Sequence, residues 1–472
     1  MQKQSLPQSR QTPQLLDVLI LAAGLGTRMK SKRAKVLHEI GGLPLIAYVC
    51  RAAESLNPDR IFVVVGHQAA EVQKAVETEV GSLAEFVTQE QQRGTADAVM
   101  SARGQLENRN SLLVILSGDV PLLKQETLEC FIAEHRSRGA ACSILSVRVE
   151  NPTGYGRIVR DSNEGFARIV EQRDATDDER KIREINSGIY CFDSAKLFAA
   201  LDRVKPTNDQ GEFYLTDVAE ILLSQREKVS VHLHGDAREV SGINTRAELA
   251  EFENLLRRNT VRKLMLEGGV TFLDPSRTYI SASARLGQDC VIYPDVAIEG
   301  DSVIGTGCEI HSGAKITNSR LGDYVLIKNH CVIVDSTIES NCAVGPFAHL
   351  RLNTTIEEGA VVGNFVEVKK SRLGRGSKSM HLTYLGDATI GQNTNIGAGT
   401  VTCNYDGKDK HPTVIEDNVR IGSDTMLVAP VTVGRGSVTA AGSVVTEDVP
   451  PDTLVAGVPA VVKKKLKKES DE

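Results

Sequence analysis

The residues best suited to binding or catalysis lie just after an apolar run near the start of the chain. Gly24 and Gly26 follow that run, and a string of cations comes next, which starts with Arg28 and ends with Lys35 seven residues further on. Bare backbone amides at the end of a buried strand can approach phosphate oxygens closely, and the cations can neutralise their charge. Met29 occupies the third glycine position of a dinucleotide fingerprint, and the sequence contains no P-loop run. The stretch therefore predicts a phosphate-binding turn of another kind.

Two further residues could do chemistry, although each also has an ordinary structural interpretation. Asp119 ends the predicted strand SLLVILSGD, where a carboxylate can bind a cation or simply form a turn. His381 stands alone in MHLTYLGD, and imidazole can act as a general base because it titrates near neutral pH. The residue type alone settles neither role, so the elements that position these side chains must be considered.

Composition and charge indicate a multidomain protein that is not specialised for nucleic acid. The 472 residues are too many for one ordinary core, and a net charge of −6 argues against a nucleic-acid binder. No apolar run is long enough to span a bilayer, and residues 1–16 are expected to form a disordered leader, not a signal peptide. Nine cysteines without a C-x-x-C pair indicate reduced thiols. These features predict a cytoplasmic protein.

In the first half of the chain, β-branched apolar runs alternate with segments of helical spacing. The runs at 16–24, 60–67 and 111–119 predict buried parallel strands, and segments 35–56 and 69–80 predict helices. This alternation predicts an α/β domain with a doubly wound, Rossmann-like sheet.

We expect that domain to cover residues 17–245. Residues 246–268 keep helical spacing until two glycines end it, which predicts a linker helix.

Beyond Gly269 a six-residue period replaces the helical one. An aliphatic residue recurs every six positions over 286–373, with a few steps of five, and the period returns over 385–396 and 415–445. Such a period predicts a left-handed parallel β-helix of hexapeptide repeats over 269–459, in which each aliphatic side chain points toward the axis.

The interruptions of this period are predicted to be functional loops. We expect Gly374–Tyr384 and Thr400–Val414 to leave the coil, and loops are where binding and catalytic residues concentrate.

Rods of this kind favour contacts between copies, so a homo-oligomer is expected. Residues 460–472 are expected to form a charged tail.

Motifs in both halves of the chain resemble one family. LAAGLGTRM and KVLHEIGG are similar to the sugar-nucleotide pyrophosphorylases, which join a nucleoside triphosphate to a sugar 1-phosphate. Together with GPFAHLR, GNFVEVKK, HLTYLGDATIG and NIGAGTVTCNYDG, they resemble the bifunctional N-acetylglucosamine-1-phosphate uridylyltransferase and glucosamine-1-phosphate N-acetyltransferase family. The resemblance runs from about Leu19 to Pro459.

The resemblance implies two reactions that make UDP-N-acetylglucosamine. Acetyl-CoA would acetylate glucosamine 1-phosphate, and UTP would then uridylylate N-acetylglucosamine 1-phosphate with release of pyrophosphate. The product would supply peptidoglycan and lipopolysaccharide synthesis. The resemblance also implies Mg²⁺ as cofactor, acetyl-CoA as co-substrate and a homotrimer, without nucleic acid or membrane insertion.

Carried over residue by residue, the resemblance implies a set of positions in the first domain. Arg28 and Lys35 would act on the phosphates during uridylyl transfer, and Asp119 with Asn244 would hold Mg²⁺. The nucleotide-binding and sugar-binding positions would be Leu21, Ala22, Ala23, Gly24, Gln89, Gly94, Thr95, Ser117, Gly118, Asp119, Gly156, Glu171, Asn186 and Asn244.

In the rod, the resemblance implies that His381 is the general base for the sugar amine. The N–H of Ala398 is a candidate oxyanion donor, and Lys410 could come from a neighbouring subunit. The sugar-binding positions would be Arg351, Lys369, Tyr384 and Asn395. The acetyl-CoA positions would be Ala398, Asn404, Tyr405, Ser423 and Ala441.

The sequence departs from the family where an arginine late in the chain contacts the coenzyme phosphate. Gly457 stands at about that position, and the lysines of the run 463–468 could substitute for the arginine. Two other functions remain open. The rod could serve only as a scaffold for a uridylyltransferase, or the whole protein could be a binding scaffold. The first alternative leaves His381 without a role, and the second leaves Arg28 and Lys35 without one.

Overall fold

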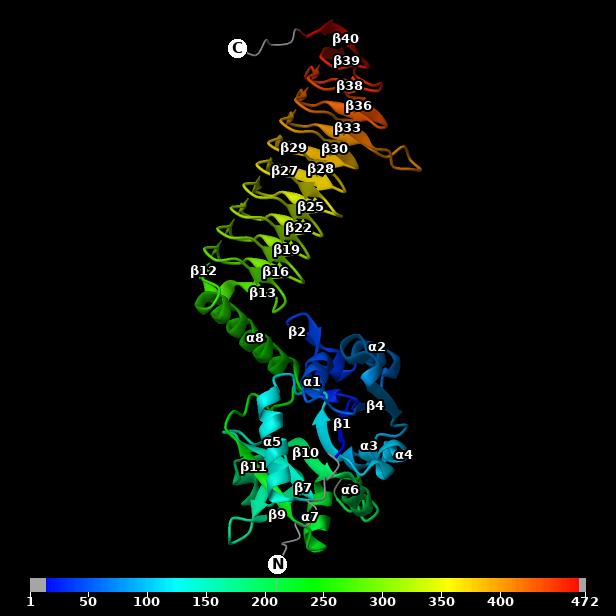
Figure 1. The fold of residues 1–472 in the computed structure, drawn as a ribbon, viewed down its shortest axis with the longest axis vertical. Helices are drawn as coiled ribbons and strands as arrows, with labels where there is room; N and C mark the ends of the chain where they lie inside the picture. Colours follow the sequence, from blue (N-terminus) through cyan, green and yellow to red (C-terminus); the bar gives the residue numbers. More distant parts are fainter. Residues whose placement is uncertain (1–13, 209, 467–472) are drawn as a thin grey trace, which may run out of the picture. The chain divides into compact units, whose positions relative to one another are not determined.

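The computed structural model describes residues 14–208 and 210–466, so most of the expected leader and the end of the expected tail lie outside the described residues. The chain divides into two compact units after Phe252. The division falls inside helix α8 (Arg246–Leu266), which occupies the segment where a linker helix was predicted. Figure 1 shows the two units as ribbons.

The first unit is built on a mixed β-sheet whose central path runs β11-β7-β10-β6-β1-β4-β5. These strands are β1 (Leu16–Leu21), β4 (Arg60–Val65), β5 (Ala84–Thr88), β6 (Leu112–Ser117), β7 (Cys142–Arg148), β10 (Glu184–Asp193) and β11 (Val229–His234). As predicted, β1 is parallel to both β4 and β6. Strand β10 is antiparallel to β6 and β7, and the hairpin β8 (Arg157–Arg160) and β9 (Phe166–Val170) pairs with it.

Helices cover both faces of this sheet, which explains why its central strands β1, β4 and β6 are largely apolar. Alternate side chains of β1 enter different cores: Val18 and Ile20 pack in one, and Leu19 packs in the other. The first core takes side chains from α1 (Leu45–Glu54), α2 (Ala69–Val80) and α5 (Gln125–Arg138). The second takes them from α3 (Thr95–Ser101), α4 (Arg103–Leu106), α6 (Ser194–Leu201) and α7 (Thr216–Ser224). The doubly wound prediction is confirmed.

The helix predicted over 35–56 is wrong in nearly its first half. Lys35–Leu37 form a single 3-10 turn, and β2 (Glu39–Ile40) and β3 (Leu43–Pro44) form a small hairpin. Gly41 and Gly42, both with positive φ, make the hairpin turn, and α1 begins only after Pro44. The glycine pair therefore overrides the helical spacing of the neighbouring apolar residues.

The second unit is a parallel β-helix with three faces. The first face contains β12 (Thr271–Phe272), β15 (Val291–Ile292), β18 (Glu309–Ile310), β21 (Leu326–Ile327), β24 (Ala343–Val344), the starts of β27 (Val361–Lys369) and β29 (Lys378–Gly386), β31 (Asn395–Ile396), β34 (Arg420–Ile421), β37 (Val438–Thr439) and β39 (Thr453–Gly457).

The second face contains β13 (Tyr279–Ile280), β16 (Ala297–Glu299), β19 (Lys315–Thr317), β22 (Val332–Val334), β25 (His349–Arg351), the ends of β27 and β29, β32 (Val401–Cys403), β35 (Met426–Val428) and β38 (Val444–Val445). The third face contains β14 (Arg285–Leu286), β17 (Val303–Ile304), β20 (Arg320–Leu321), β23 (Thr337–Ile338), β26 (Thr355–Ile356), β28 (Arg372–Leu373), β30 (Ala388–Ile390), β33 (Thr413–Ile415) and β36 (Val431–Val433).

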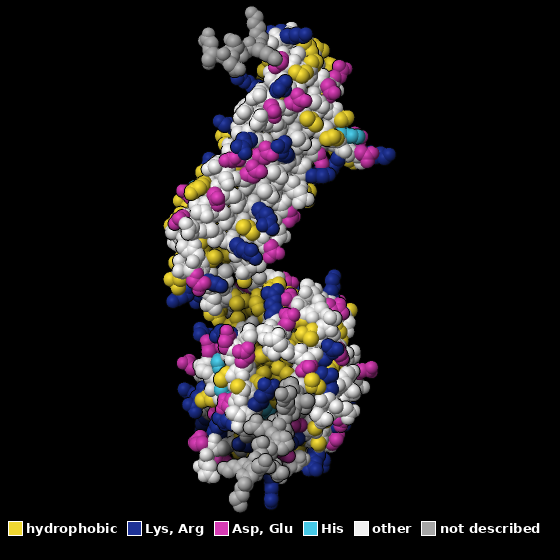
Figure 2. Space-filling model, viewed as in Figure 1, with side chains coloured by type: hydrophobic (Ala, Val, Ile, Leu, Met, Phe, Trp, Pro, Cys, Tyr) yellow, Lys and Arg dark blue, Asp and Glu magenta, His cyan; other side chains and the backbone are white. Residues whose placement is uncertain are grey.

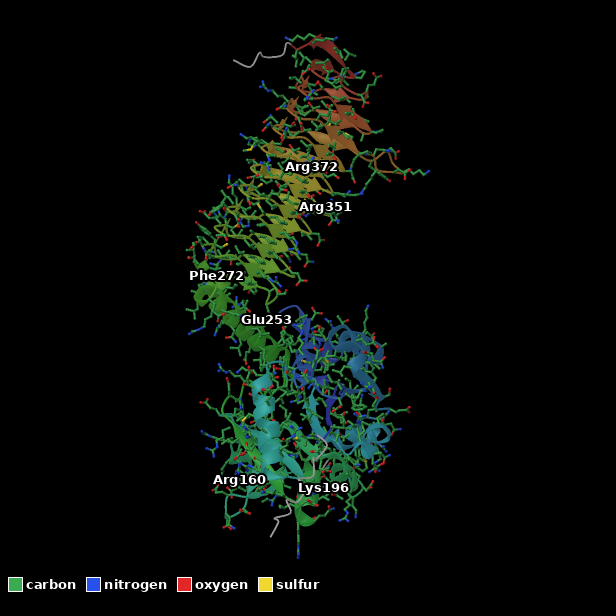
Figure 3. The ribbon with its side chains drawn as sticks, viewed as in Figure 1. Arg160, Lys196, Glu253, Phe272, Arg351 and Arg372 are labelled. Carbon is green, nitrogen blue, oxygen red and sulfur yellow. The ribbon has the colours of Figure 1, made fainter. Side chains whose placement is uncertain are left out.

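The aliphatic residues of the six-residue period fill the axis of this coil, as predicted. Ile327, Leu350 and Val368 are fully buried, and the whole set belongs to one continuous core. Phe272 lies at the first turn (Figure 3), where it shares that core with Val261 of α8. Charges of both signs are interspersed on the outer surface that Figure 2 shows, which agrees with the absence of a basic stripe in the sequence.

The first interruption of the period is not a loop, contrary to the prediction. Residues 378–386 form the continuous strand β29, and Ser379 takes the inward position that an aliphatic residue holds elsewhere. In the second interruption Thr402 also points inward, where its hydroxyl accepts from the Gly386 amide (2.7 Å) and donates to its carbonyl (3.1 Å). Only residues 404–412 leave the coil. The coil thus continues through positions where a buried hydroxyl residue replaces the aliphatic one.

The expected charged tail is structured in part. Residues Ala460–Lys465 form β40, which runs antiparallel to β39. Lys464 and Lys465 pair with Leu454 and Thr453, the residues at the start of β39. These lysines are therefore a strand length away from Gly457, where the family's coenzyme arginine was expected.

Candidate active sites

The first candidate site is a cavity at the carboxyl ends of β1 and β6, the edge where open α/β sheets bind ligands. It has a volume of about 540 Å³. The predicted site residues that line it are Leu21, Ala22, Ala23, Gly24, Arg28, Lys35, Gln89, Gly94, Thr95, Ser117, Asp119, Glu171 and Asn244. The structure therefore brings residues from six separate segments to one place.

A glycine turn lets both predicted cations reach this cavity. Gly26 has a φ of 59°, and a Cβ there would lie only 2.6 Å from the Cβ of Lys35, so the chain can fold back only over glycine. Lys35 then forms an ion pair with Asp119 and donates to Asn244 Oδ1 at 3.1 Å. Arg28 donates to the same oxygen at 2.8 Å. The two cations and the two predicted metal ligands thus form one polar cluster.

The oxygen atoms of this cluster suit a hard cation. Asp119 supplies a carboxylate and Asn244 an amide oxygen, the ligand types that Mg²⁺ prefers. Gly242 leaves the space that Asp119 needs, because a Cβ there would lie 2.8 Å from its carboxylate. Within residues 14–208 and 210–466, no group of three His, Cys, Asp or Glu side chains could hold a metal ion. The pair fits an ion that keeps most of its water.

On another side of the cavity, predicted and unpredicted residues form separate hydrogen bonds. Gln89 is almost fully buried and donates to Asp97 at 2.8 Å. Gln92 donates to the carbonyl of Ala23 at 2.8 Å and fixes the turn after β1. Thr95 accepts from the amide of Leu215 at 3.0 Å. Sequence reasoning missed Gln92 and Asp97, although both follow Gln89 within eight residues.

The predicted sugar positions lie around Glu171. Burial, followed by the charges of Asp174 and Asp217, raises the pKa of Glu171 to about 6. Gly156 lies against it, since a Cβ there would be 3.1 Å from a carboxylate oxygen of Glu171. The carbonyl of Gly156 accepts from the amide of Asn186 at 2.9 Å. Gly156 and Asn186 thus support the carboxylate without lining the cavity, and Gly118 does not line it either.

The second candidate site follows one corner of the coil, between its first and second faces. We call this line of turns the His381 corner; it contains Asn364, His381, Ala398, Ser423 and Ala441. The amide of Gly399 donates to Leu382, that of Asp424 to Ala398, and that of Gly442 to Ser423, at 2.7–3.0 Å. The predicted base and three of the predicted acetyl-CoA positions are therefore stacked on successive turns. In the described coil, the Ala398 N–H has no acceptor, as an oxyanion donor requires.

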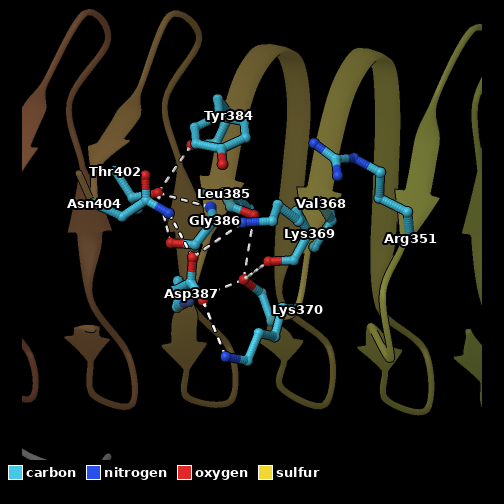
Figure 4. A network of polar contacts seen from close by, with 12 residues as sticks. Arg351, Val368, Lys369, Lys370, Tyr384, Leu385, Gly386, Asp387, Thr402 and Asn404 are labelled. Carbon is cyan, nitrogen blue, oxygen red and sulfur yellow. Dashed lines mark hydrogen bonds and ion pairs between the residues drawn. The ribbon is translucent and has the colours of Figure 1, made fainter. Parts of the chain in front are cut away.

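The second face beside this corner contains a cationic network (Figure 4). Lys369 is almost fully buried and lies 3.4 Å from Asp387, which also accepts from the amide of Asn404 at 2.6 Å. Lys370 approaches the same carboxylate at 3.6 Å. Burial alone would raise the pKa of Asp387, but the Asn404 amide and the Lys369 charge hold it below its ordinary value. Asp387 was missed because an aspartate after a strand resembles a turn residue.

Arg351 and Lys410 complete the positive side of this face. Arg351 is held by Glu367, with nitrogen–oxygen distances of 2.7 and 2.8 Å. The amines of Lys369 and Lys410 face each other, and the pairing with Lys369 lowers the pKa of Lys410 because two ammonium groups repel. A phosphate bound here would relieve the repulsion between the two lysines.

Two predicted site residues do not join this arrangement within one chain. Asn395 lies on the first face, opposite Lys378, whereas Tyr384 lies on the second face, opposite Glu367. Tyr405 is exposed in the loop 404–412, where its hydroxyl donates to Gly407 at 2.7 Å. One chain therefore does not gather the whole predicted sugar set on one face.

Known protein families match both units. Residues 17–237 match the Nucleotidyl transferase family, residues 275–354 the GMPPB C-terminal domain, and residues 412–447 six repeats of the bacterial transferase hexapeptide. A solved UDP-glucose pyrophosphorylase complexed with UDP-glucose aligns with 52% of this chain and 99% of its own, at 16% identity and a TM-score of 0.44. Fold, sites and family matches define a nucleotidyltransferase joined to a hexapeptide acyltransferase.

Whole-chain relatives specify the family. A Bifunctional protein GlmU of Syntrophomonas wolfei is 47% identical over 93% of this chain and 96% of its own length. Those of Heliobacterium modesticaldum and a Geobacillus strain are 47% and 46% identical, over 95% and 92% of this chain and 96% and 94% of their own lengths. The chain belongs to the GlmU family of bifunctional proteins. It is a uridylyltransferase and an acetyltransferase in one polypeptide, which confirms the function predicted from its motifs.

Proposed function

We propose that the two candidate sites divide the synthesis of UDP-N-acetylglucosamine between the two units. Uridylyl transfer takes place in the unit predicted over 17–245, and acetyl transfer on the coil predicted over 269–459. The observation that carries the proposal is the convergence of Arg28 and Lys35 on Asp119 and Asn244 in a cavity of the first unit.

Uridylyl transfer requires two anionic substrates to meet. An oxygen of N-acetylglucosamine 1-phosphate attacks the α-phosphorus of UTP, the α–β phosphoanhydride bond breaks, and pyrophosphate leaves with the electron pair. Arg28 and Lys35 neutralise the triphosphate, and the backbone after β1 lies against the nucleotide. Catalysis is then mainly positioning and charge stabilisation. Glu171 accepts hydrogen bonds from the sugar hydroxyls.

Asp119 and Asn244 are the residues that would hold Mg²⁺. The ion, when bound, offsets the negative charge of the phosphates that the site gathers. Asp119 and Asn244 accept from Lys35 and Arg28, so the residues that would hold the ion lie beside the cations that neutralise the phosphates.

Acetyl transfer takes place along the His381 corner. The amine of glucosamine 1-phosphate gives a proton to His381 and forms a bond to the thioester carbonyl carbon, whose carbon–sulfur bond then breaks to release CoA. The Ala398 N–H stabilises the oxyanion, and Arg351 with Lys369 holds the sugar phosphate. Ser423 and Ala441 continue the same corner and give the extended coenzyme a track parallel to the coil axis.

A homotrimer would complete this second site. Phe347, Phe365 and Leu382 are about half exposed or more at the corner positions of successive turns, and the two phenyl rings stack 5.3 Å apart. An exposed apolar line of this kind is typical of a surface that another chain covers. A second copy could also bring Asn395 from its first face to the Tyr384 side of the corner. Light scattering of the purified protein tests this assembly, and an active monomer would exclude it.

The surroundings of the protein follow from its substrates. No helix in the described part of the chain combines the length and apolar character of a membrane crossing. All nine cysteines are free. UTP and acetyl-CoA are cytoplasmic metabolites, so we place the protein in the cytoplasm, where it supplies a precursor of peptidoglycan and lipopolysaccharide.

One assay of the purified protein tests the division of labour. The two half-reactions are measured separately, CoA release from acetyl-CoA with glucosamine 1-phosphate, and pyrophosphate release from UTP with N-acetylglucosamine 1-phosphate and Mg²⁺. We expect both. Pyrophosphate release without CoA release would make the coil a scaffold only.

A further inference from the structure

The side chain of Asn364 contacts the ring of His381. Asn364 lies in β27 and His381 in β29, directly opposite each other in parallel register on neighbouring turns of the coil. The Asn364 amide oxygen lies 2.8 Å from His381 Nδ1. The two residues are 17 positions apart in the sequence, and no single motif indicates their contact.

The backbone makes this contact close and well fixed. Strands β27 and β29 each run without interruption for nine residues through the His381 corner. Gly363 precedes Asn364, and a Cβ there would lie 1.9 Å from the Met380 carbonyl oxygen, so the two turns approach each other more closely than any other residue would permit. The Thr383 hydroxyl donates to the carbonyl of His381 at 2.6 Å and holds the backbone on the other side.

The hydrogen-bond acceptor in this contact determines the tautomer of His381. An amide oxygen can only accept, so Nδ1 of a neutral His381 must carry the hydrogen. Nε2 then has a free lone pair, and the described residues give it no hydrogen-bond partner. A base for the sugar amine needs such a nitrogen. Without the contact the ring could also adopt the other tautomer, in which Nε2 carries the hydrogen and cannot accept a proton.

We propose that Asn364 is a positioning residue for acetyl transfer, which fixes His381 in the Nδ1–H tautomer and so leaves Nε2 ready to accept the amine proton. The proposal rests on the proposed role of His381 as the base. It requires that Asn364 act through His381. It also requires that residues on the neighbouring face bind the sugar phosphate independently of Asn364.

Two substitutions of matched shape test the proposal. Asn364→Leu keeps the approximate shape and removes the acceptor, and Asn364→Asp keeps an acceptor. Since a hydrogen bond of this kind is worth up to about tenfold in a rate, Asn364→Leu should lower kcat for acetyl transfer by about tenfold. The KM for glucosamine 1-phosphate should stay within about twofold of wild type, because the phosphate contacts remain. Asn364→Asp should recover most of the loss. Equal loss in both variants would overturn the proposal.

A double-mutant comparison separates this proposal from the role of His381 itself. In a His381→Ala background, Asn364→Leu should have no further effect on kcat, because a residue that acts through the ring has nothing left to position. Full activity of His381→Ala would reject the proposed base, whereas a strong loss there with wild-type activity of Asn364→Leu would reject only the positioning role. Pyrophosphate release, measured on every preparation, shows that each variant is folded.

The tautomer can also be observed directly in the unaltered protein. Nitrogen-15 NMR of histidine-labelled enzyme should show His381 with a protonated Nδ1 and an unprotonated Nε2 at high pH. The reverse tautomer would overturn the proposal, because it would mean that the Asn364 amide nitrogen faces the ring.

Discussion

The α/β unit and the β-helix assemble their sites in opposite ways. In the α/β unit, Arg28 contacts Asn244, which is 216 positions away, and Lys35 contacts Asp119, 84 positions away. In the β-helix, Asn364 contacts His381 and Asn404 contacts Asp387, both 17 positions apart. One site depends on the whole sheet, and the other on the stacking of adjacent turns.

This difference determines how sensitive each site is to substitutions elsewhere in its unit. A site made from several sheet ends requires every loop to have its correct conformation, so it is sensitive to distant changes. A site made from successive turns needs only local register, because each turn of a repeat structure contacts mainly its neighbours. Substitutions within one unit should therefore leave the chemistry of the other intact, and the following experiments test that independence.

The largest effect is expected at His381. His381→Ala removes the proposed general base from the corner, and such a base typically contributes about 10²- to 10⁴-fold. Acetyl transfer should fall by that factor, while the KM for glucosamine 1-phosphate changes little because Arg351 and Lys369 remain. Both half-reactions are measured on one preparation. Wild-type acetyl transfer would show that His381 is structural, and a parallel fall of both activities would contradict the independence of the units.

The matching change in the α/β unit is Asp119→Asn. It removes the carboxylate that we propose holds Mg²⁺, so the charge stabilisation that the ion would give in the phosphate cavity should be lost. Pyrophosphate release should fall by about 10²- to 10³-fold. Acetyl transfer should stay at the wild-type rate in the same preparation. Unchanged pyrophosphate release over a Mg²⁺ titration would exclude Asp119 as a metal ligand.

Sequence periodicity predicted the coil better than it predicted the chemistry on it. The inward aliphatic residues could be read from their spacing because the core of a β-helix is linear in sequence. Ser379 and Thr402 broke the pattern, because a hydroxyl residue at an inward position interrupts the aliphatic spacing and so suggests a loop. Asp387 and Asn364 were missed for a related reason: both lie in quoted motifs, but the residues they contact are 17 positions away, so no single motif shows the contact.

In the α/β unit, the strands and most cavity residues could be predicted, but their contacts could not. Buried parallel strands are continuous apolar runs, and β1, β4 and β6 were recognised by that feature. The antiparallel strand β10 was not, because strand direction depends on tertiary pairing. The contact of Lys35 and Arg28 with one amide oxygen depends on the turn at Gly26, which the sequence shows only as a glycine.

A smaller effect, on stability, should distinguish inward from outward positions of the coil. Ile327 is fully buried, and Ile327→Val removes one methylene from the axis, which typically costs about 0.5–1.5 kcal/mol of unfolding free energy. Val332 is 37% exposed, so Val332→Ala should cost much less. Denaturant unfolding of the two variants measures the difference. Pyrophosphate release should be unchanged in both, and equal costs at the two positions would contradict the packing of the axis.

The smallest expected effect is the pH dependence of uridylyl transfer through Glu171. Burial and the nearby carboxylates of Asp174 and Asp217 raise its pKa to about 6, against 4.5 ordinarily, so the folded protein holds this proton more tightly than the unfolded chain does. As the pH falls from 7 to 6, the protonated share of Glu171 rises from about one tenth to about half, and a protonated carboxyl can no longer accept the two hydrogen bonds that we propose it receives from the sugar. The kcat/KM for N-acetylglucosamine 1-phosphate should therefore fall about twofold over that range and about tenfold by pH 5, while the corresponding constant for acetyl transfer need not follow it.

In Glu171→Gln, whose amide does not titrate in this range, kcat/KM should be lower at pH 7 and should lose this acid limb. If the limb persists unchanged in Glu171→Gln, it belongs to another group, and the substrate phosphate, which also titrates near this pH, is then its source.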